Sequence, residues 1–354
     1  MPDDESTLKP ARVGHTAEGI ASSHDQDHFA NACHDHRRDR SSPHGFADHA
    51  SRRALLDQEH ERDKFVSGSE WKQLDAHRWT TAGTLSSAAG APESCPPNAC
   101  QQLVINAARN SLFHRGVFRA TVSRLVFLLG GGRDIDIGFR DVIFRLEGGR
   151  NLIEYGILLK PAYNAEDIDF LLGAISDGGV FVDIGCNIGL YSLPLARAAG
   201  PRGRCISIDA NPLMTTRLLR NAALSGIANI TAIASAVGDR EATGQLVVRK
   251  NDDAIVAVEE TDDGPIRVRP LAALLEEAGV TRIDGLKIDI EGHEDLALPP
   301  FLDTAERAML PRRIVIEHPE PNSDYPGCAT ALDRHGYQLV GRTHNNSLYR
   351  LGDG

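Results

Sequence analysis

From residue 165 onward, short apolar runs alternate with segments whose apolar residues recur at helical spacing. The runs at 180–184, 205–208, 230–234, 286–290 and 314–316 predict strands, and the segments at 165–175, 190–199, 212–225 and 271–278 predict helices. Asn211 and Pro212 suit the start of the helix over 212–225, and Gly226 suits its end. Strands and helices in alternation predict a doubly wound α/β fold with a mainly parallel sheet. Residues 336–340 and 347–351 predict a C-terminal antiparallel hairpin.

Residues 101–164 show a different pattern. Apolar residues recur at helical intervals over 103–129, residues 141–146 alternate like a half-buried strand, and residues 152–159 suit another strand. We therefore expect an accessory subdomain over 101–164, packed on a core over 165–351.

Residues 1–100 are polar, and their sparse apolar positions keep neither a helical nor a strand period. Such a segment buries too little apolar surface to offset the entropy of ordering, which predicts a mostly disordered leader. A short helix over 51–65 is compatible with the pattern. Cys33, His34 and His36 raise the alternative of a zinc site, but without paired cysteines a solvated polar tract is favoured.

Composition narrows the class of protein. The net charge is −11, which argues against a general nucleic-acid binder because such proteins usually carry a basic stripe. The six cysteines form no C-x-x-C pair, so a reducing, cytoplasmic setting is expected. No secretory signal or apolar run long enough for a membrane span is present in the sequence.

The turn after the first predicted core strand, Asp183-Ile184-Gly185-Cys186-Asn187-Ile188-Gly189, is the first candidate for chemistry. Ligands of open α/β sheets bind at the carboxyl ends of the strands, where Gly185 and Gly189 allow a sharp turn and a close approach of the backbone. The stretch does not match G-x-G-x-x-G of dinucleotide enzymes. An acid at Asp183 is typical of enzymes that use S-adenosylmethionine (SAM), since it can meet the cationic amino acid end. A purely structural glycine turn is the alternative.

Two further acids follow later strands. Asp209 ends the second core strand, about twenty residues on, where a carboxylate accepts hydrogen bonds from ribose hydroxyls. A charge there disfavours the 2′-phosphate of NADP. Asp239 could meet the adenine amino group or could serve as a turn residue.

The segment from Lys287 to Glu294 places three acids and a histidine at the end of the fourth core strand. Charged groups so near an apolar strand are costly unless they are paired or used. Asp289 is expected to point at the site of methyl transfer. Glu291 or Glu294 is expected to hold the acceptor or to orient the loop. A divalent metal site is the alternative. His318, after the fifth strand, is either a general base or a structural histidine.

These blocks resemble the FkbM family of SAM-dependent methyltransferases over about residues 141–351. The resemblance rests on the turn from Asp183 to Ser192, on Ala236-Val237-Gly238-Asp239, and above all on the segment from Lys287 to Glu294. Cys186 and Asp209-Ala210 depart from the family's usual Ala and Glu-Pro, although the acid is kept.

The resemblance implies a class I, Rossmann-like methyltransferase fold with SAM as cofactor. It implies transfer to a hydroxyl of a sugar or another small molecule of natural-product type. Candidate cofactor-binding residues are Asp183, Gly185, Asn187, Gly189, Asp209 and Asp239, and candidate catalytic residues are Asp289, Glu291 and His318, with no metal. No nucleic-acid partner is expected.

Three other functions stay open: methylation of a nitrogen or of a protein side chain, SAM binding without catalysis, and an NAD enzyme. The intact acids at Asp183, Asp209 and Asp289 argue against lost catalysis. Acceptor-binding residues are expected from the accessory subdomain and from a loop over 249–265.

Overall fold

The computed structural model describes residues 92–112, 118–148, 151–248, 256–320 and 323–352. All of them belong to the second of the two units into which the chain divides, Ser69–Gly354. The predicted leader up to residue 91, its short helix over 51–65 and the zinc alternative at Cys33, His34 and His36 lie outside the described residues.

The core is a seven-stranded sheet in the order β12-β13-β11-β10-β3-β4-β5. Five strands are parallel: β3 (Val180–Ile184), β4 (Arg204–Asp209), β5 (Ile230–Ala234), β10 (Gly285–Ile288) and β11 (Arg313–Glu317). The antiparallel strands β12 (Tyr337–Arg342) and β13 (Asn346–Leu351) follow at one edge. The chain runs outward from β3 to β5 and then returns to β10 on the other side of β3. The carboxyl ends of β3 and β10 therefore meet at the switch point of the sheet, where α/β proteins bind ligands.

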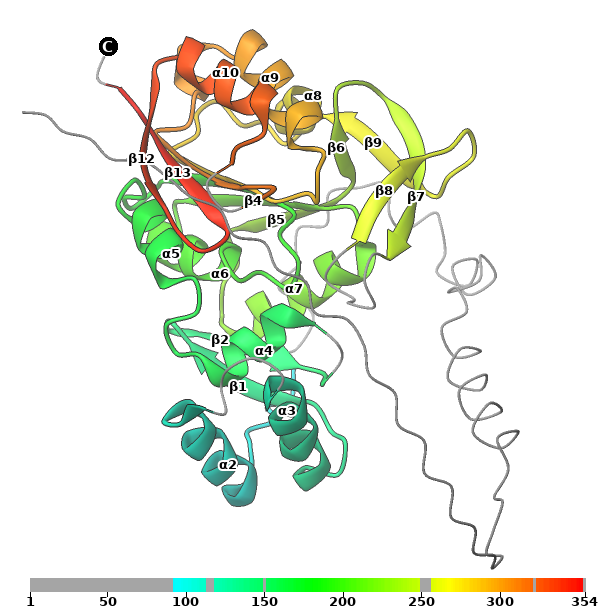
Figure 1. The fold of residues 1–354 in the computed structure, drawn as a ribbon, viewed down its shortest axis with the longest axis vertical. Helices are drawn as coiled ribbons and strands as arrows, with labels where there is room; N and C mark the ends of the chain where they lie inside the picture. Colours follow the sequence, from blue (N-terminus) through cyan, green and yellow to red (C-terminus); the bar gives the residue numbers. More distant parts are fainter. Residues whose placement is uncertain (1–91, 113–117, 149–150, 249–255, 321–322, 353–354) are drawn as a thin grey trace, which may run out of the picture. The chain divides into compact units, whose positions relative to one another are not determined.

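Helices cover both faces of this sheet (Figure 1). One apolar cluster joins Phe181 of β3 and Cys205 of β4 to α5 (Ala165–Leu172), α6 (Ser192–Ala199) and α7 (Pro212–Leu224). The other joins the alternate positions Val180, Val182 and Ile184 to α8 (Leu271–Glu277), α9 (Glu294–Thr304) and α10 (Pro326–Arg334). Residues of odd number in β3 thus face α6, and those of even number face the α8–α10 layer. The α/β class predicted from the sequence is confirmed.

Asn211 and Gly226 bound α7 as predicted. The Asn211 side chain accepts a hydrogen bond from the amide of Leu213, Pro212 occupies the first turn, and Gly226 follows the helix with φ +65°.

A second sheet was not predicted from the sequence. It has the order β6-β9-β7-β8 and consists of β6 (Ala236–Gly238), β7 (Ala242–Val248), β8 (Val256–Glu260) and β9 (Ile266–Pro270). The predicted acceptor loop over 249–265 is partly wrong, because its residues 256–260 form β8. Residues 249–255 lie outside the described part.

The segment before the core contains α2 (Ala99–Arg109), α3 (Phe118–Leu129), the hairpin of β1 (Ile135–Phe139) and β2 (Val142–Leu146), and α4 (Leu152–Leu159). The strand predicted over 152–159 is wrong, because this segment is helix α4. Its apolar residues show no decisive period, and the helix start is fixed locally by Asn151, whose side chain accepts from the amide of Ile153.

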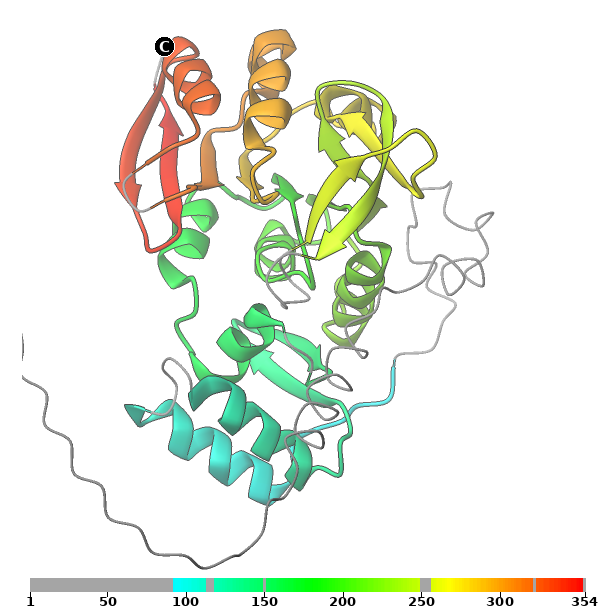
Figure 2. The ribbon, with the colours of Figure 1, turned by 45° about the vertical axis from the view of Figure 1, so that its right-hand side comes forward.

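Helix α7 anchors this segment to the core. The amide of Arg145 in β2 donates to Asn221 Oδ1 at 2.9 Å, and Glu154 of α4 forms a buried ion pair with Arg217. In Figure 2, α4 lies between the core sheet and the α2–α3 pair. A boundary between subdomain and core at 164/165 stays a prediction. None of the described helices combines the length and apolar character that crossing a bilayer requires.

Candidate active site

A cavity of about 510 Å³ opens at the carboxyl ends of β3, β4, β10 and β11. Its floor includes Gly185, Asp209, Asp289 and Glu317, each at or directly after the end of one of these strands. Leu152 and Ile153 of α4 form one wall, and residues of the second sheet form another. The cavity size suits a small-molecule ligand.

Gly185 allows β3 and β10 to converge at this floor. Its φ is +74°, and its amide donates to the carbonyl of Ile208 in β4 at 2.8 Å. A Cβ atom at this position would overlap the backbone carbonyl oxygen of Asp289. The glycine is therefore required by the neighbouring strand end as well as by the turn itself.

Asn187 and Asp209 connect the turn after β3 to the end of β4. The amide of Asn187 donates to Asp209 Oδ2, and the amide of Asn211 donates to Oδ1, each at 2.8 Å. Each carboxylate oxygen keeps a lone pair that can accept a ribose hydroxyl. Burial raises the pKa of Asp209 to about 6, although both amide bonds oppose this shift.

The accessory segment contacts the same turn. Asn187 has a left-handed backbone, with φ +47°, and its Oδ1 accepts from Asn151 Nδ2 at 3.1 Å. Since Asn151 also begins α4, the start of this helix and the turn after β3 are fixed together.

Asp183 lies below the cavity floor and is fully buried. Its odd position in β3 directs it toward α6, where Ser192 Oγ donates to Asp183 Oδ2 at 2.5 Å. Burial raises the pKa of this carboxyl, and the nearby charge of Lys287 counteracts the shift. Asp183 is absent from the described cavity wall, so its predicted contact with the amino acid end of SAM stays a prediction.

Lys287 is a buried cation beneath the site. It is paired with Asp183 in the β10–β3 register, and its Nζ donates to the carbonyl of Gly185 at 2.9 Å. Nζ also lies 3.3 Å from Asp289 Oδ2. Burial lowers the pKa of Lys287, but the charges of Asp289 and Asp183 outweigh it and raise the pKa overall. The lysine therefore stays charged and stabilises the negative charge of these carboxylates.

Asp289 and Glu317 form a hydrogen-bonded carboxyl pair at the cavity floor. Burial, together with the charge of Asp289, raises the pKa of Glu317 to about 9. Glu317 therefore keeps its proton near neutral pH and donates it to Asp289. Within the pair, Asp289 is therefore the acceptor of this hydrogen bond.

Glu294 fixes the loop after β10. It is fully buried, and its two oxygens accept from the amides of Ile290 at 2.7 Å and Gly292 at 3.0 Å. Burial raises the pKa of Glu294, and the hydrogen bonds from the Ile290 amide and from Tyr325 oppose this shift. Glu291, with φ +55°, lines the cavity. The sequence predicted that Glu291 or Glu294 holds the acceptor or orients the loop, and the two amide bonds of Glu294 indicate that this residue orients the loop.

One group of side chains within the described ranges has the proximity that a metal site needs. Ligand atoms of Asp289, Glu294 and Glu317 lie within 4.8 Å of one another. However, both Glu294 oxygens already accept backbone amides, and Glu317 shares its proton with Asp289. A site without metal stays the prediction.

His318 lines the cavity and is 8% exposed. Its Nδ1 is buried and has no hydrogen-bond partner among the residues that the structure describes. Since no described neighbour on that side can accept a relayed proton, His318 is a weaker candidate base than Asp289.

The structure brings six of the nine predicted site residues to one cavity: Gly185, Asn187, Asp209, Asp289, Glu291 and His318. The other three do not line its described wall. Gly189 has φ +97° and packs against Leu193 and Leu218, and Asp239 forms an exposed ion pair with Arg240. The neighbouring Gly238 lines the cavity instead.

Glu317, Lys287 and Asn151 had no role in the sequence prediction. A lysine inside the apolar run of β10 was a visible signal, because an unpaired buried charge is costly. The pairing of Glu317 with Asp289 had no local signal.

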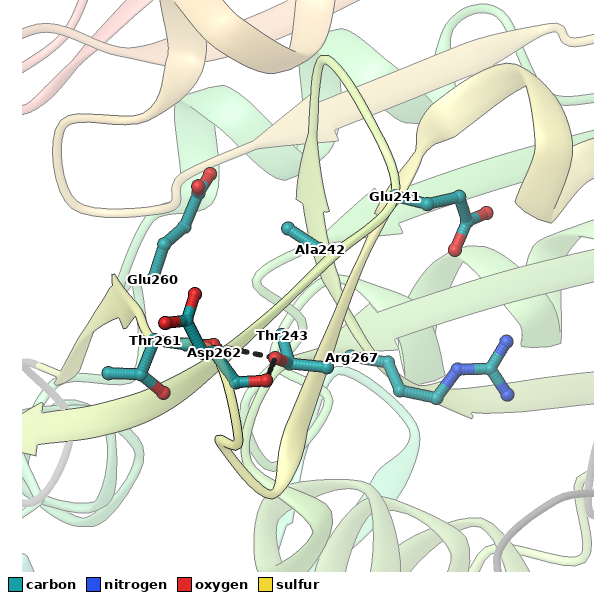
Figure 3. A pocket seen from close by; sticks show the side chains of 7 residues that line it. All are labelled: Glu241, Ala242, Thr243, Glu260, Thr261, Asp262 and Arg267. Carbon is teal, nitrogen blue, oxygen red and sulfur yellow. Dashed lines mark hydrogen bonds between the residues drawn. The ribbon is translucent and has the colours of Figure 1, made fainter.

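A second hollow, of about 650 Å³, lies on the small sheet (Figure 3). Thr243 Oγ1 donates to the carbonyls of Thr261 and Asp262 there, at 2.6 and 3.1 Å. Its described lining includes no strand end of the core sheet, which leaves the smaller cavity as the candidate active site.

Comparison with known proteins agrees with this choice. Residues 183–339 match the family profile described as the methyltransferase FkbM domain, a range that includes both Asp183 and Glu317. No curated protein sequence matches the chain.

Solved structures give distant matches. A putative rRNA methylase from Clostridium thermocellum is 10% identical, with a TM-score of 0.36, over 54% of this chain and 96% of that one. TYW2 of M. jannaschii in complex with AdoMet is 13% identical, with a TM-score of 0.35, over 62% and 87%. A SAM-dependent O-methyltransferase from Thermotoga maritima is 14% identical, with a TM-score of 0.33, over 53% and 66%.

The family match covers the turn after β3, the end of β4 and the carboxyl pair, which together form the cavity floor. Residues 183–339 of this chain therefore match the FkbM methyltransferase domain, and this match indicates SAM as the cofactor.

Proposed function

We propose that the protein methylates a hydroxyl group of a small molecule. The observation that carries this proposal is the Asp289–Glu317 carboxyl pair in the wall of the cavity. A hydroxyl is a poor nucleophile near neutral pH, so its methylation benefits from a base, whereas a neutral amine needs none.

The cofactor fits other residues that line the same cavity. Asp209 has a free lone pair on each oxygen for the ribose hydroxyls, and the Gly185 turn leaves room for a close approach of the ligand to the backbone. When bound, SAM supplies an activated methyl group, so the protein mainly orients the acceptor and excludes water.

Asp289, the carboxylate of the pair, takes the proton that the hydroxyl loses. Lys287 keeps the charge of the pair stable before transfer, and Glu294 holds the loop that follows Asp289. Such a base contributes about 10²–10⁴-fold to the rate. His318 is the second candidate for the same role, as foreseen from the sequence.

The competing functions are methylation of nitrogen and SAM binding without catalysis. Carboxylates close to an acceptor amine would hold it as ammonium, which has no lone pair for attack. This argues for oxygen as the methylated atom, and the intact pair argues for catalysis.

The test uses the full chain, SAM with a ¹³C-labelled methyl group and a panel of hydroxylated sugars and other polyols. We expect a methyl ether by NMR. Asp289→Asn should lower kcat by about 10²-fold or more while the Kd for SAM stays within about 3-fold, because asparagine cannot take up the proton.

Glu320→Gln is the matched control, because Glu320 is exposed and lies outside the described cavity wall. An N-methyl product, or full turnover by Asp289→Asn, would contradict the proposal. SAM binding without transfer to any acceptor would support the non-catalytic alternative.

A further inference from the structure

Tyr191 directly precedes helix α6 and is absent from the described cavity wall. Its side chain is buried, and the ammonium of Lys287 lies over its ring, 5.4 Å from the ring centroid. This separation is within the range of a cation–π interaction. The same ammonium donates to the carbonyl of Gly185 and lies 3.3 Å from Asp289 Oδ2. The aromatic ring and these two oxygen atoms therefore share one cation.

The hydroxyl of Tyr191 is hydrogen-bonded to the start of α5. It accepts from Asn164 Nδ2 at 2.8 Å and donates to Asp167 Oδ2 at 3.2 Å. Burial raises the pKa of Tyr191, and the charge of Asp167 adds to this shift, so the hydroxyl keeps its proton and can donate it. The ring is therefore fixed at its hydroxyl end while its face meets Lys287.

Asp167 connects this tyrosine to the C-terminal hairpin. It is buried, and it accepts from Thr343 Oγ1 and Asn346 Nδ2, each at 2.8 Å. Thr343 follows β12, and Asn346 begins β13, where it lies opposite Glu317 in the β11–β13 register. A buried carboxylate with three side-chain donors fixes the positions of the groups around it. The hairpin, α5 and Tyr191 are therefore held together beside the strand end that bears Glu317.

We propose that Tyr191 is a positioning residue for the transfer site, whose ring holds the Lys287 ammonium beside Asp289. Asp167 fixes the ring in turn, from α5 and the C-terminal hairpin. This inference rests on the proposed function, in which Asp289 takes the proton of the acceptor. Once protonated, Asp289 has no charge to attract the lysine, whereas the attraction between the ring and the ammonium does not depend on that proton. The ring therefore keeps Lys287 in place through the proton transfer.

The first experiment measures how well Lys287 is held, so that its readout does not depend on turnover. The full chain is treated with acetic anhydride, and acetylation of Lys287 is followed by peptide mass spectrometry, with the partly exposed Lys160 as internal reference. Lys287 is 3% exposed, so we expect slow acetylation in the parent protein. Tyr191→Leu removes the ring and should raise this rate at least about 10-fold. Tyr191→Phe keeps the ring but loses its hydroxyl bonds, and should raise the rate about 3-fold.

Tyr337 offers the matched controls. Tyr337 and Tyr191 are each 5% exposed, and the Tyr337 hydroxyl donates to the carbonyl of Pro311 at 2.8 Å. Tyr337→Leu and Tyr337→Phe therefore remove the same groups from another part of the core, outside the described cavity wall. We expect both to leave the acetylation of Lys287 close to that of the parent protein. Equal rates in the Tyr191 and Tyr337 variants would overturn the inference.

The second experiment measures turnover of the polyol that gives a methyl ether in the screen. Tyr191→Leu should lower kcat about 10-fold or more, while the Kd for SAM and the KM for the polyol stay within about 3-fold. Faster acetylation of Lys287 with an unchanged kcat, or a loss confined to KM, would contradict the positioning role. If urea unfolding shows that Tyr191→Leu does not fold, Tyr191→Phe takes its place, and acetylation and kcat equal to those of the parent would overturn the inference.

The inference and the proposed function fail separately. If the Tyr191 variants expose Lys287 but no acceptor is methylated, the proposed function fails, and the role of Tyr191 in holding the lysine stands. If a hydroxyl is methylated and the Tyr191 variants match the Tyr337 variants in both readouts, the inference fails alone.

Discussion

Replacing Gly185 by alanine tests the close approach of β3 and β10 beneath the cavity. Two costs add up at this position. Alanine at φ +74° sits in the left-handed region, at a cost of about 1–2 kcal/mol. The new Cβ also lies far inside the 3.0 Å below which such contacts essentially never occur, and the atom it meets is the backbone oxygen of Asp289.

Backbone cannot move aside as a flexible side chain can, so this overlap should add about 1–3 kcal/mol. We therefore expect Gly185→Ala to lower the free energy of unfolding by about 2–5 kcal/mol in total. For a domain of this size, the melting temperature should fall by about 5–15 °C.

Gly226→Ala is the matched control. Gly226 has φ +65°, and an added Cβ would meet no atom within 4 Å, so this variant reports backbone strain alone. The assay is urea unfolding of both full-length variants beside the parent protein. If Gly185→Ala costs no more than Gly226→Ala, the carbonyl of Asp289 does not approach β3 as described, and the geometry of the cavity floor is wrong.

Three further predictions concern the site. Asp209→Asn should weaken SAM binding about 10–100-fold, as measured by calorimetry. Because the pKa of Asp209 is raised to about 6, SAM binding by the parent protein should also weaken as the pH falls below 6, and this pH dependence should be missing in the variant. Asn151→Ala should raise the Kd for SAM about 5-fold through the lost bond to Asn187. Asn98→Ala removes another helix cap and should leave the Kd unchanged; equal effects would contradict the link. The pKa of Glu317 rises on folding from 4.5 to about 9, so between these pH values the folded protein binds a proton that the unfolded chain releases, and the protein should lose stability as the pH rises. In urea unfolding at several pH values, Glu317→Gln should reduce this dependence of the free energy of unfolding on pH.

Local patterns in the sequence determined much of the core. Apolar runs and helical spacing predicted the parallel strands, and Asn211, Pro212 and Gly226 set the bounds of α7, because capping and left-handed turns depend on neighbouring residues. The segment over 152–159 was misread, since a uniformly apolar run has no period and its helix start depends on one side chain, that of Asn151. The second sheet was missed, because its strands are joined by pairings that no single segment reveals.

For the site as well, part of the arrangement could be predicted from the sequence and part depends on the tertiary structure. The sequence by itself determined which acids stand at the ends of the strands, because each follows an apolar run directly. Only the tertiary structure decided which of them face the cavity. Asp183 and Asp209 both follow such runs, yet the alternation of β3 turns Asp183 down toward α6 while Asp209 reaches the cavity. The pairing of Asp289 with Glu317 arises because β10 and β11 lie side by side, although the two residues are far apart in the chain. Strand order and register decide which residues become neighbours at the site. The packing of the whole sheet supplies the free energy that fixes this order and register.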